Sequence, residues 1–233
     1  MNRVDGIIIP SQMTEWYIAA IASRIKNRVF LDFYSETDGY GCVLSNNFPG
    51  SYTLTKLLVA AAHMRRGVIG STSAATGILD RYMGFRKAMP EAPLPYNAAI
   101  KDRDANGVYI EIKLQPDAYT AYVYNNDQIA GVAIVRLRDI NLKVPCCISI
   151  VGSDNENGAV AAGIGVTSLE FNVQDMRATA IDQLIERVES KSYRLRGKRF
   201  IDGRVVGRDK AIHSRSSEMT RCRKRRAWRF AAL

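Results

Sequence analysis

Two kinds of hydrophobic pattern alternate along the chain. Short apolar runs of strand length occur at 4–10, 29–32, 41–45, 67–70, 119–124, 148–151 and 166–171. Between them lie segments in which apolar residues recur every three or four positions, at 14–25, 50–64, 78–89, 127–137 and 173–188. The first pattern predicts strands and the second predicts helices that each bury one face. Strands that alternate with helices in this way predict an α/β protein with parallel sheets.

The most informative stretch runs from Tyr119 to Asn155 and predicts a strand, a helix and a second strand. Each strand ends in a polar cluster: Asn125, Asn126 and Asp127 follow the first, and Ser153, Asp154 and Asn155 follow the second. In an open parallel sheet the carboxyl ends of neighbouring strands face one crevice, where ligands bind. We therefore expect Asn126 and Asp154 to meet there.

Two other polar residues are candidates for the same crevice. Asp32 ends the apolar run at 29–32, which favours a position at the crevice over a simple capping role. Arg81 lies in the helical segment DRYMGF, and its guanidinium offers a fork of donors that suits neighbouring hydroxyl groups. The alternative for Arg81 is a solvated helix arginine paired with Asp80.

Two segments carry weaker signals. The alternation in VYIEIKL (Val108 to Leu114) predicts a half-buried strand in an otherwise unreadable region, 96–118. In RFIDGRVV, two strand-like arms flank Asp202 and Gly203, which predicts a β-hairpin with a type I′ turn.

Composition is that of an ordinary soluble globular protein. The chain has 233 residues, of which 47% are hydrophobic and 24% charged, and its formal net charge is +10. No apolar stretch is long enough to span a bilayer, and no secretion signal follows Met1, so we expect no membrane role and a cytoplasmic protein. Residues 213–233 carry seven Lys or Arg and one acid, and so supply +6 of the net charge. This tail is either disordered, which we favour, or an arm that binds nucleic acid.

Motifs for catalysis or for a bound metal are absent from the sequence. Neither GxGxxG nor GxxxxGK[ST] occurs, and the glycines of GAVAAGIG have the wrong spacing. The two histidines, His63 and His213, have no matched nucleophile, and the four cysteines form no CxxC pair. We therefore predict a protein that is not an enzyme and that has no metal and no cofactor.

The order of the motifs resembles the effector-binding core of the lactose-repressor (LacI/GalR) family of bacterial transcription regulators. That family has an NDxxA turn, a VPxDISIxGFD strand and an LTT strand; here NDQIA, VPCCISIVGSD and VTSLEF occur at similar spacings. The resemblance implies two doubly wound, Rossmann-like lobes of the type I periplasmic-binding-protein kind, the first of them incomplete. The first lobe would hold 1–44 and 172–195, and the second 45–171 and 196–212. Ala62 and Arg66 depart from the family pattern LGHxxI, which has glycine and an apolar residue there.

The resemblance also implies a ligand site. Asp32, Arg81, Asn126 and Asp154 match pocket positions of the family, and Phe171 would be either an aromatic wall of the pocket or a core residue. Carboxylates, an arginine and an amide together suit a sugar, whose neighbouring hydroxyls both donate and accept hydrogen bonds.

The implied function is that of a small-molecule sensor. The chain would bind a small polar effector, a sugar, and act as a homodimer that reaches DNA only through a headpiece absent from this chain. The alternative is an extracytoplasmic sugar-binding protein of a transporter, which has the same two-lobed fold.

Overall fold

The computed structural model describes residues 4–35, 41–89, 99–104, 106–156, 165–190, 197–208 and 212. The chain divides into two compact units. Unit 1 comprises Met1–Asn46, Ala75–Gly77 and Phe171–Gly203, and unit 2 comprises Asn47–Ala74, Ile78–Glu170 and Arg204–Leu233. The tail at 213–233, for which disorder was expected, lies outside the described residues.

Unit 1 contains a four-stranded sheet in the order β1-β2-β3-β8. Its strands are β1 (Ile7–Ile9), β2 (Arg28–Leu31), β3 (Cys42–Ser45) and β8 (Lys198–Ile201). All three neighbouring pairs are parallel. The parallel sheet that the sequence predicted is therefore present in this unit.

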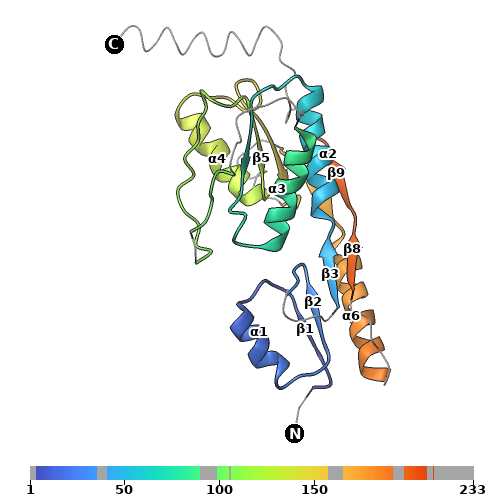
Figure 1. Ribbon diagram of the computed structural model, residues 1–233. Coiled ribbons are helices and arrows are strands. Elements are labelled where there is room, and N and C mark those ends of the chain that lie inside the picture. The colour runs from blue at the N-terminus through green and yellow to red at the C-terminus, as the bar shows by residue number, and fades with distance from the viewer. Residues whose placement is uncertain are drawn as a thin grey trace, which may run out of the picture. The chain divides into compact units, whose positions relative to one another are not determined.

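Helices α1 (Glu15–Ala22) and α6 (Val173–Glu189) pack on this sheet (Figure 1). α1 begins after Thr14, whose hydroxyl caps the helix by accepting from the backbone N–H of Tyr17. One face of the sheet packs with α1 in a core that includes Ile18 and Leu44. Ser45 follows Leu44 and so points to the opposite face, where its Oγ lies 3.6 Å from Sδ of Met176 in α6.

Unit 2 is built on a five-stranded sheet in the order β4-β5-β6-β7-β9. Its strands are β4 (Arg66–Ile69), β5 (Ala121–Tyr124), β6 (Ser149–Ser153), β7 (Thr167–Phe171) and β9 (Gly203–Val206). The pairs from β4 to β7 are parallel. The carboxyl ends of β4, β5 and β6 therefore lie at the same edge of the sheet.

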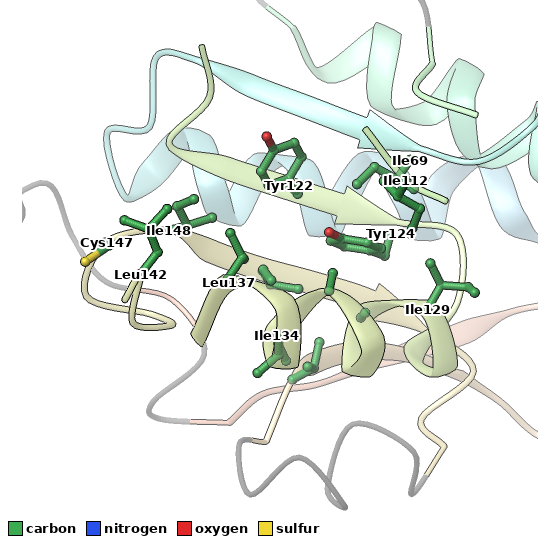
Figure 2. Close-up of a cluster of buried hydrophobic side chains, with 14 residues drawn as sticks. Ile69, Ile112, Tyr122, Tyr124, Ile129, Ile134, Leu137, Leu142, Cys147 and Ile148 are labelled. Carbon is green, nitrogen blue, oxygen red and sulfur yellow. The ribbon is translucent and has the colours of Figure 1, made fainter. Parts of the chain in front are cut away.

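Helices cover both faces of this sheet. α4 (Asp127–Asp139) packs its Ile134 and Leu137 against Tyr122 and Tyr124 of β5, and these side chains belong to one apolar core (Figure 2). Leu169 of β7 points to the other face of the sheet, away from α4, and contacts Gly50 of α2 (Asn47–Ala60) there. α3 (Thr76–Ala88) packs against α2, close enough that a Cβ on Gly84 would lie 2.2 Å from a backbone oxygen of α2. The two doubly wound α/β units expected from the sequence are confirmed.

Two predictions about secondary structure are wrong. RFIDGRVV is not a hairpin, because β8 pairs with β3 in one sheet and β9 neighbours β7 in the other. The segment 108–114 is not a strand either; it forms only an isolated antiparallel bridge between Tyr109 and Arg103. Among the described residues, no helix is both long and apolar enough to cross a membrane.

Candidate functional site

The carboxyl edge of the unit 2 sheet carries a connected polar network. It is assembled from the residues that follow β4, β5 and β6, together with one residue each from α2 and α3 and a loop that precedes β5. We call it the edge network; its members are Asn47, Ser71, Arg81, Asp102, Asn125 and Asp154.

Arg81 lies at the centre of the edge network. Its Nε donates to Oδ1 of Asn47 at 2.7 Å, its Nη2 donates to Oδ1 of Asp154 at 2.9 Å, and its Nη1 donates to the backbone oxygen of Asn125. Only 13% of the side chain is exposed. Arg81 is therefore not a solvated helix arginine paired with Asp80; three protein acceptors fix the plane of its guanidinium.

Asp154 lies at the turn that follows β6. Its φ is 88°, and the next residue, Asn155, also has a left-handed φ of 48°. Asp and Asn tolerate this region better than other non-glycine residues. The backbone N–H of Asp154 donates to the carbonyl oxygen of Leu169 at 2.7 Å, so the turn is tied to β7. With 34% of its side chain exposed, Asp154 keeps carboxylate surface available to a ligand.

Asn126 has a structural role as well as a place at this edge. Its Oδ1 caps α4 by accepting from the backbone N–H of Ile129 at 2.9 Å. Its Nδ2 faces the hydroxyl oxygen of Tyr109 at 3.5 Å. The link from β5 to Asp154 runs through the backbone of Asn125 and the side chain of Arg81.

The buried part of the edge network was missed by the sequence analysis. Asp102 is fully buried and accepts from the backbone N–H of Ser71 at 2.8 Å and from the side-chain amide of Asn125. Ser71 and Asn125 follow strands, so the rule that selected Asn126 and Asp154 selects them too. Asp102 gave no such signal because the region around it has no readable period.

The loop with Asp102 also brings an aromatic ring to this edge. The guanidinium of Arg103 lies over the ring of Tyr109, 4.6 Å from its centroid, and its Nη2 donates to the Tyr109 hydroxyl at 3.0 Å. Nε of Arg103 lies 3.6 Å from Oδ2 of Asp102. Tyr109 is therefore held beside Asn126 although 47% of it is exposed.

Asp127 is a second buried acid of this region. Burial raises the pKa of its carboxyl from 3.8 to about 7, and the nearby charge of Asp154 adds to the rise. Hydrogen bonds from Ser168 and from the backbone N–H of Glu156, and the charge of Arg208, act in the opposite direction. A large share of Asp127 carboxyls is thus neutral near pH 7.

The two remaining candidates belong to unit 1. Asp32 follows β2 with a left-handed φ of 64°, is exposed, and its Oδ1 accepts from the backbone N–H of Ser45 at 3.2 Å. Phe171 is the last residue of β7 and is 8% exposed, so little of its ring is open to a ligand. A group of three or more potential metal-binding side chains does not occur within the described part of the chain.

Comparison with protein families gives a match over residues 55–209 to the periplasmic binding protein-like domain. The chain belongs to this family. The matched segment runs from α2 to the end of β9 and contains Arg81, Asn126 and Asp154.

Individual family members identify the branch of the family. An HTH-type transcriptional repressor PurR of Pasteurella multocida (strain Pm70) is 29% identical over 199 residues, which cover 82% of this chain and 60% of the repressor. Another, from Histophilus somni (strain 2336), is 27% identical over 198 residues, again 82% and 60%. The predicted likeness to the effector-binding core of LacI/GalR regulators is confirmed, and these relatives are repressors rather than enzymes. The chain spans about 60% of the length of these relatives.

A solved structure with the same fold is a LacI family transcriptional regulator from Enterococcus faecium with bound ribose. It has a TM-score of 0.73 and 17% identity, and the match covers 91% of this chain and 81% of that one. A periplasmic binding protein/LacI transcriptional regulator from Alkaliphilus metalliredigens QYMF, complexed with D-xylulofuranose, has a TM-score of 0.73 and 19% identity over 90% and 79%. At these identities the likeness establishes the fold.

Proposed function

We propose that the chain is the effector-binding domain of a LacI-type transcription regulator and that its effector is a small, sugar-like molecule. The observation that carries this proposal is the edge network, which presents a fixed guanidinium and a half-exposed carboxylate, Arg81 and Asp154, at the carboxyl edge of a parallel sheet. This edge is where open α/β sheets bind ligands. The ribose and D-xylulofuranose in the two similar structures support a sugar.

The chemistry of these groups suits vicinal hydroxyls. The Asp154 carboxylate accepts hydrogen bonds from hydroxyl groups, and Arg81 has five N–H donors, of which three are engaged with the protein. A hydrogen bond to a charged group contributes about 1.5 to 3 kcal/mol. Asn126 and Tyr109 would add an amide and an aromatic face from the same unit.

Such a domain responds to its effector by a shift in the populations of its conformations. A ligand favours the conformation that it binds best, by an amount set by its difference in affinity for the two conformations. We propose that this shift alters DNA binding by a helix-turn-helix segment outside this chain, in a cytoplasmic homodimer. The repressor relatives favour this role over that of a sugar-binding protein of a transporter.

Thermal unfolding with added ligands tests the proposal. The chain is heated with D-ribose, D-xylulose or adenine, alone and as the Asp154→Ala variant. A ligand present at 100 times its Kd stabilises by about 2.7 kcal/mol, which raises the Tm of a chain of this size by roughly 5 to 10 °C. We expect a sugar to raise the Tm of the unchanged chain and to lose most of that effect in Asp154→Ala.

The matched control is Asp182→Ala, which removes an exposed carboxylate of α6 in unit 1. It should leave the ligand-induced change in Tm intact. A sugar effect that survives in Asp154→Ala would move the binding site away from the edge network, and the absence of any effect from sugars and nucleobases would contradict the proposed function.

A further inference from the structure

We propose that the effector site at the edge network selects an uncharged ligand and excludes phosphorylated or carboxylated ones, because the arginines there are already bonded to acceptors of the protein itself. This inference rests on the proposed function and narrows its ligand class. It follows from how the positive charges at this edge are partnered.

Arg81 is the first of these positive charges. A phosphate or carboxylate is bound most strongly by two N–H groups of one guanidinium acting together. In Arg81 the Nε and Nη2 groups are both engaged, by Asn47 at 2.7 Å and by Asp154 at 2.9 Å. An incoming anion would have to displace the carboxylate of Asp154 or lie beside it.

Arg103 is the second, and it too is partnered inside the protein. Its Nη2 donates to the Tyr109 hydroxyl and its Cζ lies over the Tyr109 ring, while its Nε forms an ion pair with the buried carboxylate of Asp102 at 3.6 Å without a hydrogen bond. The Arg103 side chain is 20% exposed. Turning it toward an anion would leave Asp102, which is fully buried, without this ion-pair partner.

The N-terminus of α4, which lies at this edge, is already capped. The N-terminus of a helix binds anions through its free backbone N–H groups and its dipole. At α4 the side chain of Asn126 already accepts from the backbone N–H of Ile129, and the acidic Asp127 is the first residue of the helix. The carboxylate of Asp154, whose charge already acts on Asp127, would repel a negative group placed there.

One more arginine approaches the Asp154 turn. Arg208 donates from Nη2 to Oδ1 of Asn155 at 2.6 Å and from Nη1 to the backbone oxygen of Val166. It therefore ties the turn to β7 rather than presenting a free cation. The two ion pairs of this edge, Arg81 with Asp154 and Arg103 with Asp102, each combine one positive and one negative charge.

This balance discriminates between ligands by charge. A hydroxyl group donates to Asp154 and accepts from a remaining N–H of Arg81 without breaking their ion pair. An anion gains an attraction to Arg81 but meets the repulsion of Asp154 at nearly the same distance. Neutralising Asp154 should therefore convert the edge network into an anion site.

The test uses inorganic phosphate as the probe, titrated against the unchanged chain and against Asp154→Asn, with sodium chloride at matched ionic strength as the reference. Thermal unfolding reports binding. On the unchanged chain we expect phosphate to have no saturable effect on the Tm. On Asp154→Asn we expect saturable binding in the millimolar range, tighter by roughly tenfold or more than any binding to the unchanged chain. Asp182→Asn, which makes the same change in net charge on exposed α6, should behave like the unchanged chain.

Two outcomes would overturn the inference. One is saturable phosphate binding to the unchanged chain that is weakened by Arg81→Met, since that would place an anion site at the edge network. The other is a folded Asp154→Asn variant, verified by circular dichroism, that gains no phosphate binding. Neither outcome depends on finding a sugar that binds, so a failure of this inference is distinguishable from a failure of the proposed function.

A paired comparison completes the test. D-ribose and D-ribose 5-phosphate differ only in the phosphoryl group. On the unchanged chain we expect D-ribose to bind at least as tightly as its phosphate, and on Asp154→Asn we expect the preference to shift toward the phosphate. Tighter binding of the phosphate to the unchanged chain would contradict the inference.

Discussion

Nη2 of Arg81 lies 2.9 Å from Oδ1 of Asp154, although the two residues are 73 positions apart in the chain. The pair joins α3 to the turn after β6, and Arg81 also holds Asn47 of α2 and the backbone of Asn125. Arg81 thus donates hydrogen bonds to three acceptors, of which Asp154 is only one. Loss of the Arg81 guanidinium removes all three hydrogen bonds, whereas loss of the Asp154 carboxylate affects one. The two residues should therefore contribute unequally to stability.

We predict that Arg81→Met lowers the free energy of unfolding by about 2 to 3 kcal/mol, because partly buried acceptors lose their donor. Asp154→Asn should cost only about 1 kcal/mol or less, as expected for a half-exposed ion pair. Urea unfolding of both variants and of the double variant measures the two costs and their coupling. If Asp154→Asn lowers the free energy of unfolding as much as Arg81→Met or more, the hydrogen bonds from Arg81 to Asn47 and Asn125 contribute little to stability, which would contradict this prediction.

Much of the candidate site was accessible from the sequence because it follows one topological rule. Parallel strands place whatever follows them at a common edge, so Asn126 and Asp154 could be selected without knowledge of any contact. The rule locates residues but does not assign partners. It gave no indication that Arg81 bonds Asn47, or that Asn126 uses its side-chain oxygen to cap α4.

The parts that could not be predicted depend on pairing between distant segments. Around Asp202 and Gly203 the local turn signal favours a hairpin, yet β8 pairs with β3, more than 150 residues away in sequence. Asp102 and Tyr109 lie in an irregular loop whose hydrogen bonds go to Ser71, Asn125 and Arg103, and local periodicity carries no information about such contacts.

Stability should depend on pH through Asp127. The pKa of its carboxyl is about 7 in the folded chain, compared with the ordinary value of 3.8 that applies to the unfolded chain. The folded state therefore binds the proton more tightly than the unfolded state does. The contribution of Asp127 to the free energy of unfolding is therefore fully present below about pH 4, falls as the pH rises, and is lost above about pH 7. The fall has a limiting slope of about 1.4 kcal/mol per pH unit.

Asp127→Asn isolates this contribution, because the amide is neutral at every pH. Between pH 5 and about pH 8, we expect the unchanged chain to lose stability relative to Asp127→Asn. The free energy of unfolding of the variant minus that of the unchanged chain should therefore rise with pH. Chemical unfolding at several pH values measures it. Asp182→Asn, which makes the same chemical change at an exposed residue of α6, is the control variant. A flat difference for Asp127→Asn would mean that its carboxyl titrates normally in the folded chain.

Arg66 is a buried charge that the fold does not fully satisfy. It is 1% exposed in β4, its Nη1 donates to the backbone oxygen of His63, and its Nε faces Sδ of Met89 at 3.3 Å. Its Nη2 has no hydrogen-bond partner among the described residues, and burial lowers the pKa of the guanidinium. The LacI/GalR pattern has an apolar residue at this position.

We predict that Arg66→Met raises the free energy of unfolding by about 1 to 2 kcal/mol, since an apolar chain of similar length removes the cost of burying an incompletely paired charge. Arg66→Ala should lower it, because the shorter side chain leaves a cavity. Urea unfolding near pH 7 separates the two. A destabilising effect of Arg66→Met would show that the contact with His63 outweighs the desolvation of the charge.

Ala62 and Asn141 occupy equivalent positions at the ends of two helices. Ala62 follows α2 with φ of 59°, and the N–H of the next residue, His63, donates to the oxygen of Leu58 at 3.0 Å. Asn141 follows α4 with φ of 60°, and the N–H of Leu142 donates to the oxygen of Leu137 at 2.8 Å. Both helices therefore end in a Schellman motif, whose left-handed residue is usually glycine.

Because the two positions share one backbone geometry, they form an internal comparison. Ala62→Gly should raise the free energy of unfolding by about 1 kcal/mol, since alanine is strained at this φ and glycine is not. Asn141→Gly should have a much smaller effect, because asparagine tolerates the left-handed region. Thermal and urea unfolding of the two variants measure both changes. Equal effects at the two sites would mean that the left-handed conformation strains Ala62 no more than it strains Asn141.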